Sequence, residues 1–389
     1  MKKLLALLLV LATFLTSAGF LSFFRGKVTD PVLAPAEGVT LPAGRLTALG
    51  DGHVLSSDFR GAEYAVVNLA NGRSTGLTLR EEDLDTWKAL FRAEYEKSGT
   101  DDMPVEDYLL LLEHMGLSLP IITSEFHVFN VRGRYAECYT DAFNVILDWK
   151  TAQVLPMTEL EGAIGLTHDG QVLTTGKADG KTVLSLYGLD GTPLRSAAFD
   201  FSAYPYQFFD IVENGVVATL CGNKDMASST APCALVFIDR EFNASAPVEL
   251  GPVRFLTRFK PYRSGTGKIL LASKSLSELL VLDPDHGSCS VVAIDRNGAS
   301  VRPFAQGMLT SGTGLTAVNG FAEDGSYALL ANLHGGLYKL DLTTLALTQQ
   351  MTLDELEAAG LSPIDANMLQ WDGGEYAVTY NKVFTVKNK

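Results

Sequence analysis

The sequence has little cysteine and little positive charge for its length. It holds 4 Cys among 389 residues, too few for the disulfide frameworks that stabilise small secreted domains. Lys and Arg number 31 against 45 Asp and Glu, a net charge of −14, which excludes a general nucleic-acid binder because phosphate neutralisation needs a basic surface. Apolar residues are abundant at 47%, so the chain has ample material for a core and is neither disordered nor collagen-like.

Motifs for catalysis and metal binding are also missing. The chain contains no His-Glu-x-x-His, Cys-x-x-Cys or Gly-x-Ser-x-Gly sequence, so zinc hydrolysis and serine-elbow chemistry have no local support. Arg263–Lys268 lacks the glycine and hydroxyl positions of a phosphate loop. Asp283–Gly287 lacks the later acidic ligands of a calcium loop and predicts a hairpin turn. No catalytic residue, metal site or cofactor is therefore predicted.

The first 27 residues predict export. Lys2 and Lys3 precede an apolar run, Leu4–Phe24, which is the order of a secretory signal. Small residues at 16–19 offer a cleavage site, yet the run also approaches the ~20 residues that span a bilayer. Residues 1–27 are therefore either a signal peptide or an N-terminal membrane anchor. Both alternatives place the rest of the chain outside the cytoplasm, secreted or anchored, with a net charge of −18.

A repeated strand ending runs through the rest of the chain. Seven apolar runs end in a polar or turn residue, at Asn68, Asp148, Gly188, Asp239, Asp283, Asp341 and Lys387. The spacings lie between 40 and 58 residues, except for the first, which is 80. Asp-Gly and Asn-Gly pairs between the runs predict hairpins. A unit of about 40–50 residues with four short strands is typical of a propeller blade.

We therefore expect an all-β, seven-bladed β-propeller over residues 37–389. Six or eight blades are open alternatives, and a pair of β-sandwiches is the rival fold. Three strands are expected after residue 366, near 368–371, 375–380 and 383–387. A strand near Glu37–Leu41 is expected to complete the last blade and close the ring. We expect a monomer.

The strand endings resemble the repeats of bacterial YVTN and quinoprotein-like propellers, a WD40-like group whose strands often end in an Asp before a turn. Leu282-Asp283-Pro284 and Leu340-Asp341-Leu342 carry this pattern, and the resemblance extends over most of residues 37–389. The chain departs from WD40 repeats because no blade ends in Trp-Asp. Its three Trp are too few for the tryptophan docking motifs of quinoprotein dehydrogenases. The resemblance implies the propeller fold and brings no cofactor.

The spacing of 80 implies an insertion between the first and second blades. Apolar residues recur there at helical spacing, predicting a helix over 81–97, and a Pro and a Gly bracket a second helix. This helical hairpin, residues 81–116, is expected either to dock on its own blades or to serve as a lid or partner-binding element. A shorter helix is expected near 353–359, where Thr352 and Glu355 form a capping box.

Two blade connections are expected at Tyr204–Phe209 and Pro252–Arg263. The first is rich in aromatic residues, and the second lies in a stretch with a local excess of positive charge. Between Gly251 and Lys268 there are five basic residues and no acidic one. We expect a basic aromatic patch for an anionic ligand, because guanidinium groups suit carboxylate or phosphate and flat rings suit sugars or peptide side chains. The alternative is that the rings pack between blades while the Arg side chains reach solvent or neighbouring acids. The expected patch consists of Arg254, Arg258, Arg263, Tyr206, Phe255 and Tyr262.

One pair of cysteines is placed to form a disulfide. Cys221 ends one apolar run and Cys233 opens the next, so a hairpin would bring them opposite each other. The alternative is two unrelated small hydrophobic side chains, which is also the expectation for Cys138 and Cys289.

Two classes of function remain open. The preferred one is a non-catalytic binding or scaffold module for a protein or an anionic envelope polymer. The other is an extracytoplasmic enzyme, a hydrolase, lyase or lactonase, with its site in the central funnel. Convergence of three or more carboxylates and histidines would favour the enzyme. The first residues to inspect are Asp141, Asp210, Glu278 and His334, which fall near expected strand ends or loops.

Overall fold

The computed structural model describes most of the chain beyond the leader. The described residues are 30–36, 44–58, 64–98, 103–115, 126–140, 143–157, 160–222, 230–254, 259–263, 266–273, 277–295, 298–305, 316–371 and 373–388. The predicted leader, residues 1–27, lies outside them. Within these ranges, no helix is long and apolar enough to cross a membrane.

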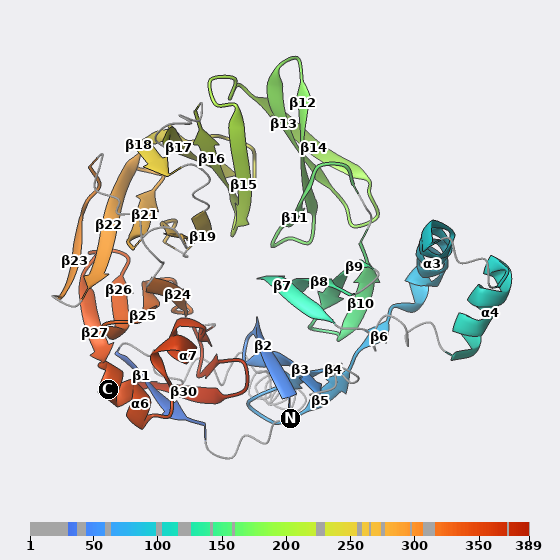
Figure 1. The fold of residues 1–389 in the computed structure, drawn as a ribbon, viewed down its shortest axis with the longest axis horizontal. Helices are drawn as coiled ribbons and strands as arrows, with labels where there is room; N and C mark the ends of the chain where they lie inside the picture. The colour runs from blue at the N-terminus through green and yellow to red at the C-terminus, as the bar shows by residue number, and fades with distance from the viewer. Residues whose placement is uncertain are drawn as a thin grey trace, which may run out of the picture.

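The described chain forms a ring of seven β-sheets, or blades (Figure 1). Blade 1 has the order β2-β3-β4-β5, blade 2 the order β7-β8-β9-β10 with β6 parallel to β10, and blade 3 the order β11-β12-β13-β14. These strands are β2 (Gly44–Gly50), β3 (His53–Asp58), β4 (Tyr64–Asn68), β5 (Ser74–Gly76), β6 (Thr78–Leu79), β7 (His127–Arg132), β8 (Tyr135–Tyr139), β9 (Asn144–Asp148), β10 (Gln153–Pro156), β11 (Ala163–Leu166), β12 (Val172–Ala178), β13 (Lys181–Tyr187) and β14 (Pro193–Phe199).

The other four blades continue the ring in chain order. Blade 4 is β15-β16-β17-β18, blade 5 is β19-β20-β21-β22-β23, blade 6 is β24-β25-β26-β27 and blade 7 is β28-β29-β30-β1. Their strands are β15 (Tyr206–Val212), β16 (Gly215–Cys221), β17 (Thr230–Asp239), β18 (Val248–Arg254), β19 (Phe259–Arg263), β20 (Ile269–Ser273), β21 (Leu279–Asp283), β22 (Ser288–Asp295), β23 (Gly298–Pro303), β24 (Thr316–Phe321), β25 (Tyr327–Asn332), β26 (Gly336–Asp341), β27 (Leu347–Met351), β28 (Gln370–Trp371), β29 (Tyr376–Val378), β30 (Val383–Asn388) and β1 (Pro31–Pro35). The seven-bladed prediction is confirmed.

The two ends of the chain close the ring in blade 7. β1 pairs antiparallel with β30, from Pro31 opposite Asn388 to Pro35 opposite Phe384. The three expected C-terminal strands are present, but the closing strand is β1 and not residues 37–41, which lie outside the described residues. The prolines at both ends of β1 obscured it. An outer strand tolerates them because one of its edges needs no ladder donor.

The repeated strand endings mark the same position in every blade. They end or directly follow the third strands β4, β9, β13, β17, β21 and β26, and lie near the end of β30. The turn that follows explains the preference for Asp: Asp341 Oδ1 accepts hydrogen bonds from Thr343 N and Thr344 N at 2.9 and 2.7 Å. Asp283 Oδ1 likewise accepts one from His286 N at 3.2 Å. A side-chain acceptor here satisfies the donors of a tight turn, so the predicted hairpin turn at 283–287 is confirmed.

Seven apolar clusters join neighbouring blades around the ring. Such clusters explain why the blades need one another, since a single four-stranded sheet leaves both faces uncovered. The cluster between blades 2 and 3 has only four buried members, Ile146, Leu155, Leu166 and Val172. The same junction also holds a buried carboxylate, Glu137, at 1% exposure.

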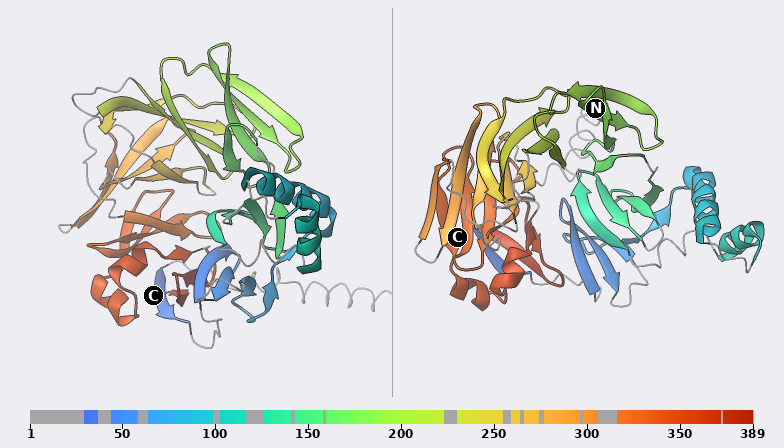
Figure 2. Two further views of the ribbon diagram at one scale, coloured as in Figure 1. Left: turned by 45° about the vertical axis from the view of Figure 1, so that its right-hand side comes forward. Right: turned by 45° about the horizontal axis from the view of Figure 1, so that its top comes forward.

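The predicted helical insertion projects from the ring between blades 1 and 2 (Figure 2). It comprises η1 (Glu81–Asp83), α3 (Leu84–Ser98) and α4 (Val105–Met115). Trp87 and Phe91 of α3 are 0% and 3% exposed, and their rings meet Phe143 edge-on at centroid distances of 6.3 and 5.1 Å. Leu110 of α4 is 61% exposed. The insertion therefore docks on its own blades through α3.

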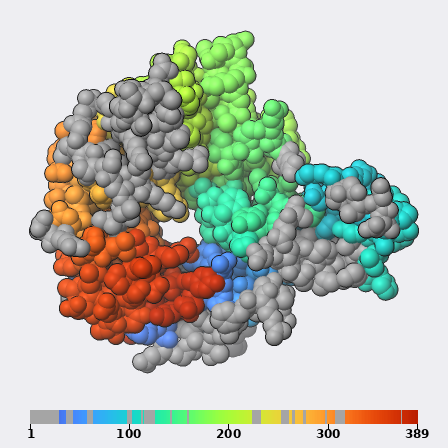
Figure 3. Space-filling view, viewed as in Figure 1, coloured from blue at the N-terminus to red at the C-terminus, as the bar shows by residue number. Residues whose placement is uncertain are grey.

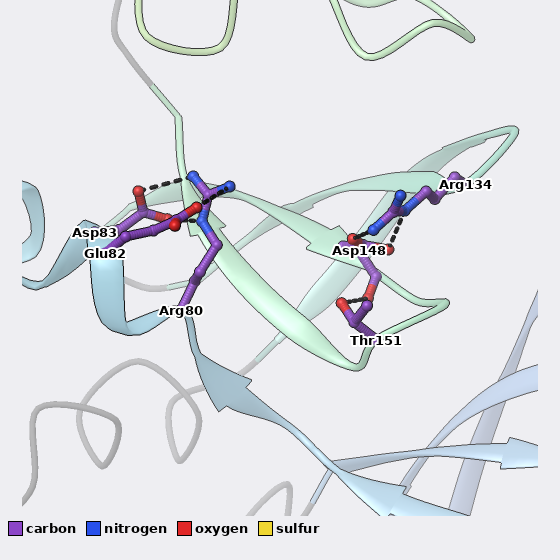
Figure 4. A network of polar contacts seen from close by, with 6 residues as sticks. All are labelled: Arg80, Glu82, Asp83, Arg134, Asp148 and Thr151. Atoms are coloured by element: carbon purple, nitrogen blue, oxygen red, sulfur yellow. Dashed lines mark hydrogen bonds and ion pairs between the residues drawn. The ribbon is translucent and has the colours of Figure 1, made fainter.

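Ion pairs and hydrogen bonds are formed at the start of the insertion and in the neighbouring blade 2 (Figure 4). Arg80, which precedes η1, pairs with Asp83 at 2.7 Å and Glu82 at 2.8 Å. In blade 2, Arg134 Nε donates to Asp148 Oδ1 at 2.8 Å. Asp148 is one of the seven strand endings and its side chain is buried. It therefore ties the first turn of its blade to the end of the third strand.

Two short helices connect blades 6 and 7. α6 (Leu353–Ala358) begins at the predicted capping box, in which Glu355 N donates to Thr352 Oγ1 at 3.2 Å and Thr352 N donates to Glu355 Oε2 at 2.7 Å. α7 (Pro363–Asn367) was not expected. Its signal is Ser362 at the N-cap with Pro363 in the first turn.

The segment expected as one connection, 252–263, is mostly strand. It contains the end of β18 and all of β19, with residues 255–258 between them. Each of these two strands contains a proline, Pro252 in β18 and Pro261 in β19. β18 and β19 are edge strands of their sheets, however, where a missing ladder donor is tolerated. Likewise Tyr206, expected in a connection, is the first residue of β15.

Candidate functional site

The two faces of the ring carry different connections. One face, here named the turn face, carries the turns between first and second strands and between third and fourth strands. The opposite face, the connection face, carries the second-to-third turns and the links between blades. A space-filling view shows an opening at the centre of the ring (Figure 3).

A pocket of about 260 Å³ lies on the turn face between blades 3 and 4. Its lining comes from the first-to-second-strand turns of both blades, from the third-to-fourth-strand turn of blade 4, and from the strands beside them. This volume is below the ~300–1,000 Å³ of drug-sized ligand sites. The pocket is several times larger than the ~30 Å³ that one water occupies in the liquid, so it suits one inserted side chain or a small fragment.

The pocket has apolar walls and a charged rim. The walls are formed by Leu173, Leu186, Leu194, Val212, Val216 and Phe242. Leu173 is fully buried, whereas Leu194 is 52% exposed, so the apolar surface continues from the floor to solvent. The charged rim residues are Asp169, Arg195, Asp239, Arg240 and Glu241. An apolar floor inside a polar rim is the anatomy of a binding hot spot.

Arg240 joins the two blades across this rim. Its guanidinium donates to Asn214 Oδ1 within blade 4 and lies 3.9 Å from Asp169 of blade 3. Arg195 of blade 3 donates in return to the Arg240 carbonyl oxygen at 3.1 Å. These contacts set the distance between the turns that border the pocket.

Phe242 forms a pocket wall from an unusual backbone conformation. Its φ is 68°, in the left-handed region that costs a non-glycine residue about 1–2 kcal/mol. The corresponding turn positions of blades 1, 3 and 5 hold Gly72, Gly191 and Gly287, also at positive φ. The Phe242 ring packs perpendicular to Phe199 with a centroid distance of 6.4 Å. The fold thus holds a bulky ring beside the pocket at a position where a glycine would avoid the backbone strain.

His168 lies at the end of the pocket nearest the ring axis. It belongs to the turn between β11 and β12 and lines the pocket. Burial and the nearby Arg132 charge lower its pKa to about 4, against a hydrogen bond to the Val212 backbone. The imidazole is therefore neutral at pH 7. Its Nδ1 is buried and has no hydrogen-bond partner among the described residues.

Next to His168 lies a buried polar cluster with residues from blades 2, 3 and 4. Arg132, at the end of β7, donates from Nη1 to the Ile211 carbonyl oxygen of blade 4 at 2.6 Å. Glu137 of β8 accepts from Asn130 Nδ2 at 2.7 Å and from the Leu166 backbone N–H of blade 3. Burial raises the pKa of Glu137 and lowers that of Arg132. Perturbed groups of this kind gather at functional sites, although structural ion pairs share the property.

The predicted basic patch is divided between the two faces. Arg254 ends β18 on the connection face, and Arg263 ends β19 on the turn face. Tyr206 begins β15 and is 41% exposed, while Tyr262 packs partly between blades 5 and 6. Phe255 and Arg258 lie outside the described residues. The anionic-ligand patch stays a prediction.

Of the four residues first considered for catalysis, Asp210 lies near the polar cluster. Its negative charge favours the charged form of Arg132 and so acts to raise the pKa of this arginine. Glu278 is buried beside β21, His334 lies in a turn of blade 6, and Asp141 lies outside the described residues. Among the residues that the structure describes, no three His, Cys, Asp or Glu side chains come together as a metal site would require.

Comparison with known proteins gives structural similarity only. No protein-family model and no curated sequence matches the chain. Among solved structures, virginiamycin B lyase from Staphylococcus aureus is 10% identical with a TM-score of 0.41, covering 92% of this chain and 100% of its own. Kuenenia stuttgartiensis hydrazine synthase is 12% identical with a TM-score of 0.40, covering 91% and 99%. A streptogramin B lyase is 8% identical with a TM-score of 0.38, covering 92% and 97%. Similarity at this level assigns no function to this chain.

Sequence reasoning missed the pocket and the polar cluster. Arg132, Glu137 and His168 come from separate turns and strands of two blades, and no spacing along the chain connects them. One signal was available for the pocket. The third-to-fourth-strand turn of blade 4 reads Asp239-Arg240-Glu241-Phe242, with a bulky ring at the place where three other blades have glycine.

Proposed function

We propose that this protein is an exported, non-catalytic binding propeller. Its pocket between blades 3 and 4 accepts an apolar side chain from a protein partner. One observation carries the proposal: the pocket combines a buried apolar floor, an exposed apolar edge at Leu194 and a charged rim. Membership of the YVTN or quinoprotein-like group, export through the leader and the monomeric state belong to the same proposal as expectations from the sequence.

Charge narrows the chemistry of the partner. The rim has three acidic side chains and two basic ones. Both arginines are engaged in contacts between or within the blades, whereas the Glu241 side chain is exposed. A Lys or Arg next to the inserted apolar residue would therefore be attracted to this rim, as complementary charge favours encounter and register.

The enzymatic alternative would use the polar cluster behind the pocket. A carboxyl with a raised pKa beside an arginine and a neutral histidine is a recognised acid–base arrangement. The Glu137 carboxylate, however, is 1% exposed and accepts hydrogen bonds from Asn130 and Leu166 on its two oxygens. This geometry supports a structural role in joining blades 2 and 3 more than contact with a substrate.

A phage-displayed random peptide library tests the binding proposal. Peptides are selected on the immobilised wild-type chain after depletion on Leu194→Glu, which places a charge at the pocket edge. Leu110→Glu, with a similarly exposed leucine on α4, is the matched control. We expect selected peptides to share an apolar residue flanked by Lys or Arg. If heparin binds the wild type instead and Arg254→Glu with Arg258→Glu abolishes this, the binding site is the basic patch.

A further inference from the structure

Cys221 and Cys233 face each other across the ladder of β16 and β17 in blade 4. Gly222 N donates to the Pro232 carbonyl oxygen at 2.7 Å, one residue beyond the cysteines. Since hydrogen-bonded and non-hydrogen-bonded pairs alternate, the cysteines occupy a non-hydrogen-bonded pair. The Cα atoms of such a pair are about 4.5 Å apart with their side chains close together, within the ~4.4–6.8 Å that a disulfide requires.

The surroundings of the pair leave this end of the blade weakly connected by backbone hydrogen bonds. Pro232 lies opposite Pro252 in β18, so neither residue supplies an N–H donor to the ladder. The register also shifts between Cys233 and Ala234. Residues 223–229, which join the two strands, lie outside the described residues. A covalent bond at this position would fix the strand ends on the connection face.

The two thiols also interact with each other. Both are free in this structure, at 2% and 0% exposure, in the apolar cluster between blades 4 and 5. A hydrogen bond from Cys233 lowers the pKa of Cys221, and the same contact together with burial raises the pKa of Cys233. Cys221 therefore has the greater thiolate character and is the better attacking sulfur.

We propose that Cys221 and Cys233 form a disulfide when the chain folds in the presence of a low-molecular-weight disulfide. The Cys221 thiolate attacks one sulfur of the oxidant, forming a mixed disulfide and releasing one thiolate. Cys233, after losing its proton, attacks the Cys221 sulfur of the mixed disulfide and releases the second thiolate. Two protein thiols are oxidised and one disulfide oxidant is reduced to two thiols. The closed loop contains about a dozen residues, for which cross-linking restricts the unfolded chain appreciably.

Peptide mapping tests this directly. The full chain is refolded with oxidised glutathione, denatured, alkylated with iodoacetamide and digested with trypsin without reduction. Because Lys224 lies between the cysteines, a disulfide links peptide 196–224 to peptide 225–240. We expect this linked pair, with Cys138 and Cys289 alkylated. Alkylation of all four cysteines, or linkage to Cys138 or Cys289, would overturn the proposal.

Thermal unfolding gives an independent readout. A reductant should lower the melting temperature of the oxidised wild type by about 5 °C and leave that of Cys221→Ala with Cys233→Ala unchanged. The matched control, Cys138→Ala with Cys289→Ala, should keep the full shift. A wild-type melting temperature that does not respond to reductant contradicts the disulfide. If the variants do not fold, the mapping of the wild type decides alone.

Discussion

Arg132 in the inner strand of blade 2 donates a hydrogen bond to the Ile211 carbonyl oxygen in blade 4, at 2.6 Å. The contact joins blade 2 directly to blade 4, which are separated along the ring by blade 3. It lies beside the junction of blades 2 and 3, where the apolar cluster is small. Arg132 also provides positive charge near the buried Glu137. One arginine thus stabilises both the ring and a carboxylate.

Arg132→Met should lower the free energy of unfolding by on the order of 3 kcal/mol, because it leaves Glu137 buried with less compensating charge. Adding Glu137→Gln should recover part of this loss, since the neutral amide needs no compensation. Arg302→Met, on the exposed outer strand of blade 5, should change stability by at most about 0.5 kcal/mol. Denaturant unfolding of the variants checks this. Additive effects of the two cluster substitutions would show that they are not coupled.

His168 should make the fold sensitive to acid. The unfolded chain takes up a proton at this side chain near pH 6.5, whereas the folded chain does so only near its pKa of about 4. Above pH 6.5, His168 is neutral in both states and does not lower the free energy of unfolding. Below that pH the free energy of unfolding declines toward pH 4, by about 3 kcal/mol at most. Glu137, whose pKa is raised by burial, has the opposite dependence.

Comparing the wild type with His168→Gln separates the pH dependence of stability caused by His168 from that caused by Glu137. Glutamine keeps a polar group near the Val212 backbone but does not titrate. The wild type should lose more stability than the variant between pH 7 and pH 4.5, measured by urea midpoints. Parallel curves would contradict the depressed pKa.

Trp87 should be the main anchor of the helical insertion. Its side chain is fully buried and meets Phe143 of blade 2, so Trp87→Ala should cost about 3–5 kcal/mol. Leu110→Ala on the exposed side of α4 should cost no more than about 0.5 kcal/mol. Thermal unfolding compares the two. Equal effects would mean that the insertion does not contribute to the core. Deleting residues 81–116 would therefore disturb the fold as well as any partner contact.

Phe242→Asn should separate binding from stability. Asparagine tolerates positive φ, so relief of about 1–2 kcal/mol of backbone strain should offset the lost contact with Phe199. The melting temperature should change little, while affinity for a selected peptide should fall. Leu345→Asn is the control, because Leu345 has a φ of 59° in the equivalent turn of blade 6, which does not border the pocket. Loss of affinity in both variants would argue against a role of the Phe242 ring.

The blade repeat could be predicted from the sequence because its physical cause is local. An Asp at the end of a third strand accepts backbone hydrogen bonds from the next few residues, as Asp341 does. The capping box of Thr352 and Glu355 is local in the same way and was predicted correctly. Three edge strands that contain proline, β1, β18 and β19, were not predicted, because an edge position is a property of the whole sheet.

The candidate site could not be predicted for a related reason. The pocket walls Leu173, Val216 and Phe242 meet because two blades pack side by side, and the sequence reveals neither the angle nor the depth of that packing. Arg132, Glu137 and His168 have unremarkable sequence neighbours. Their altered pKa values arise from burial, which only the assembled ring produces.

The affinity of a library-selected peptide for three proteins tests the binding proposal most directly. Calorimetric titration would compare the wild type, Leu194→Glu at the pocket edge and Leu110→Glu on α4. The proposal predicts that Leu194→Glu weakens binding at least about tenfold, ~1.4 kcal/mol, and that Leu110→Glu binds as the wild type does. Equal affinity of the wild type and Leu194→Glu would contradict a binding site between blades 3 and 4.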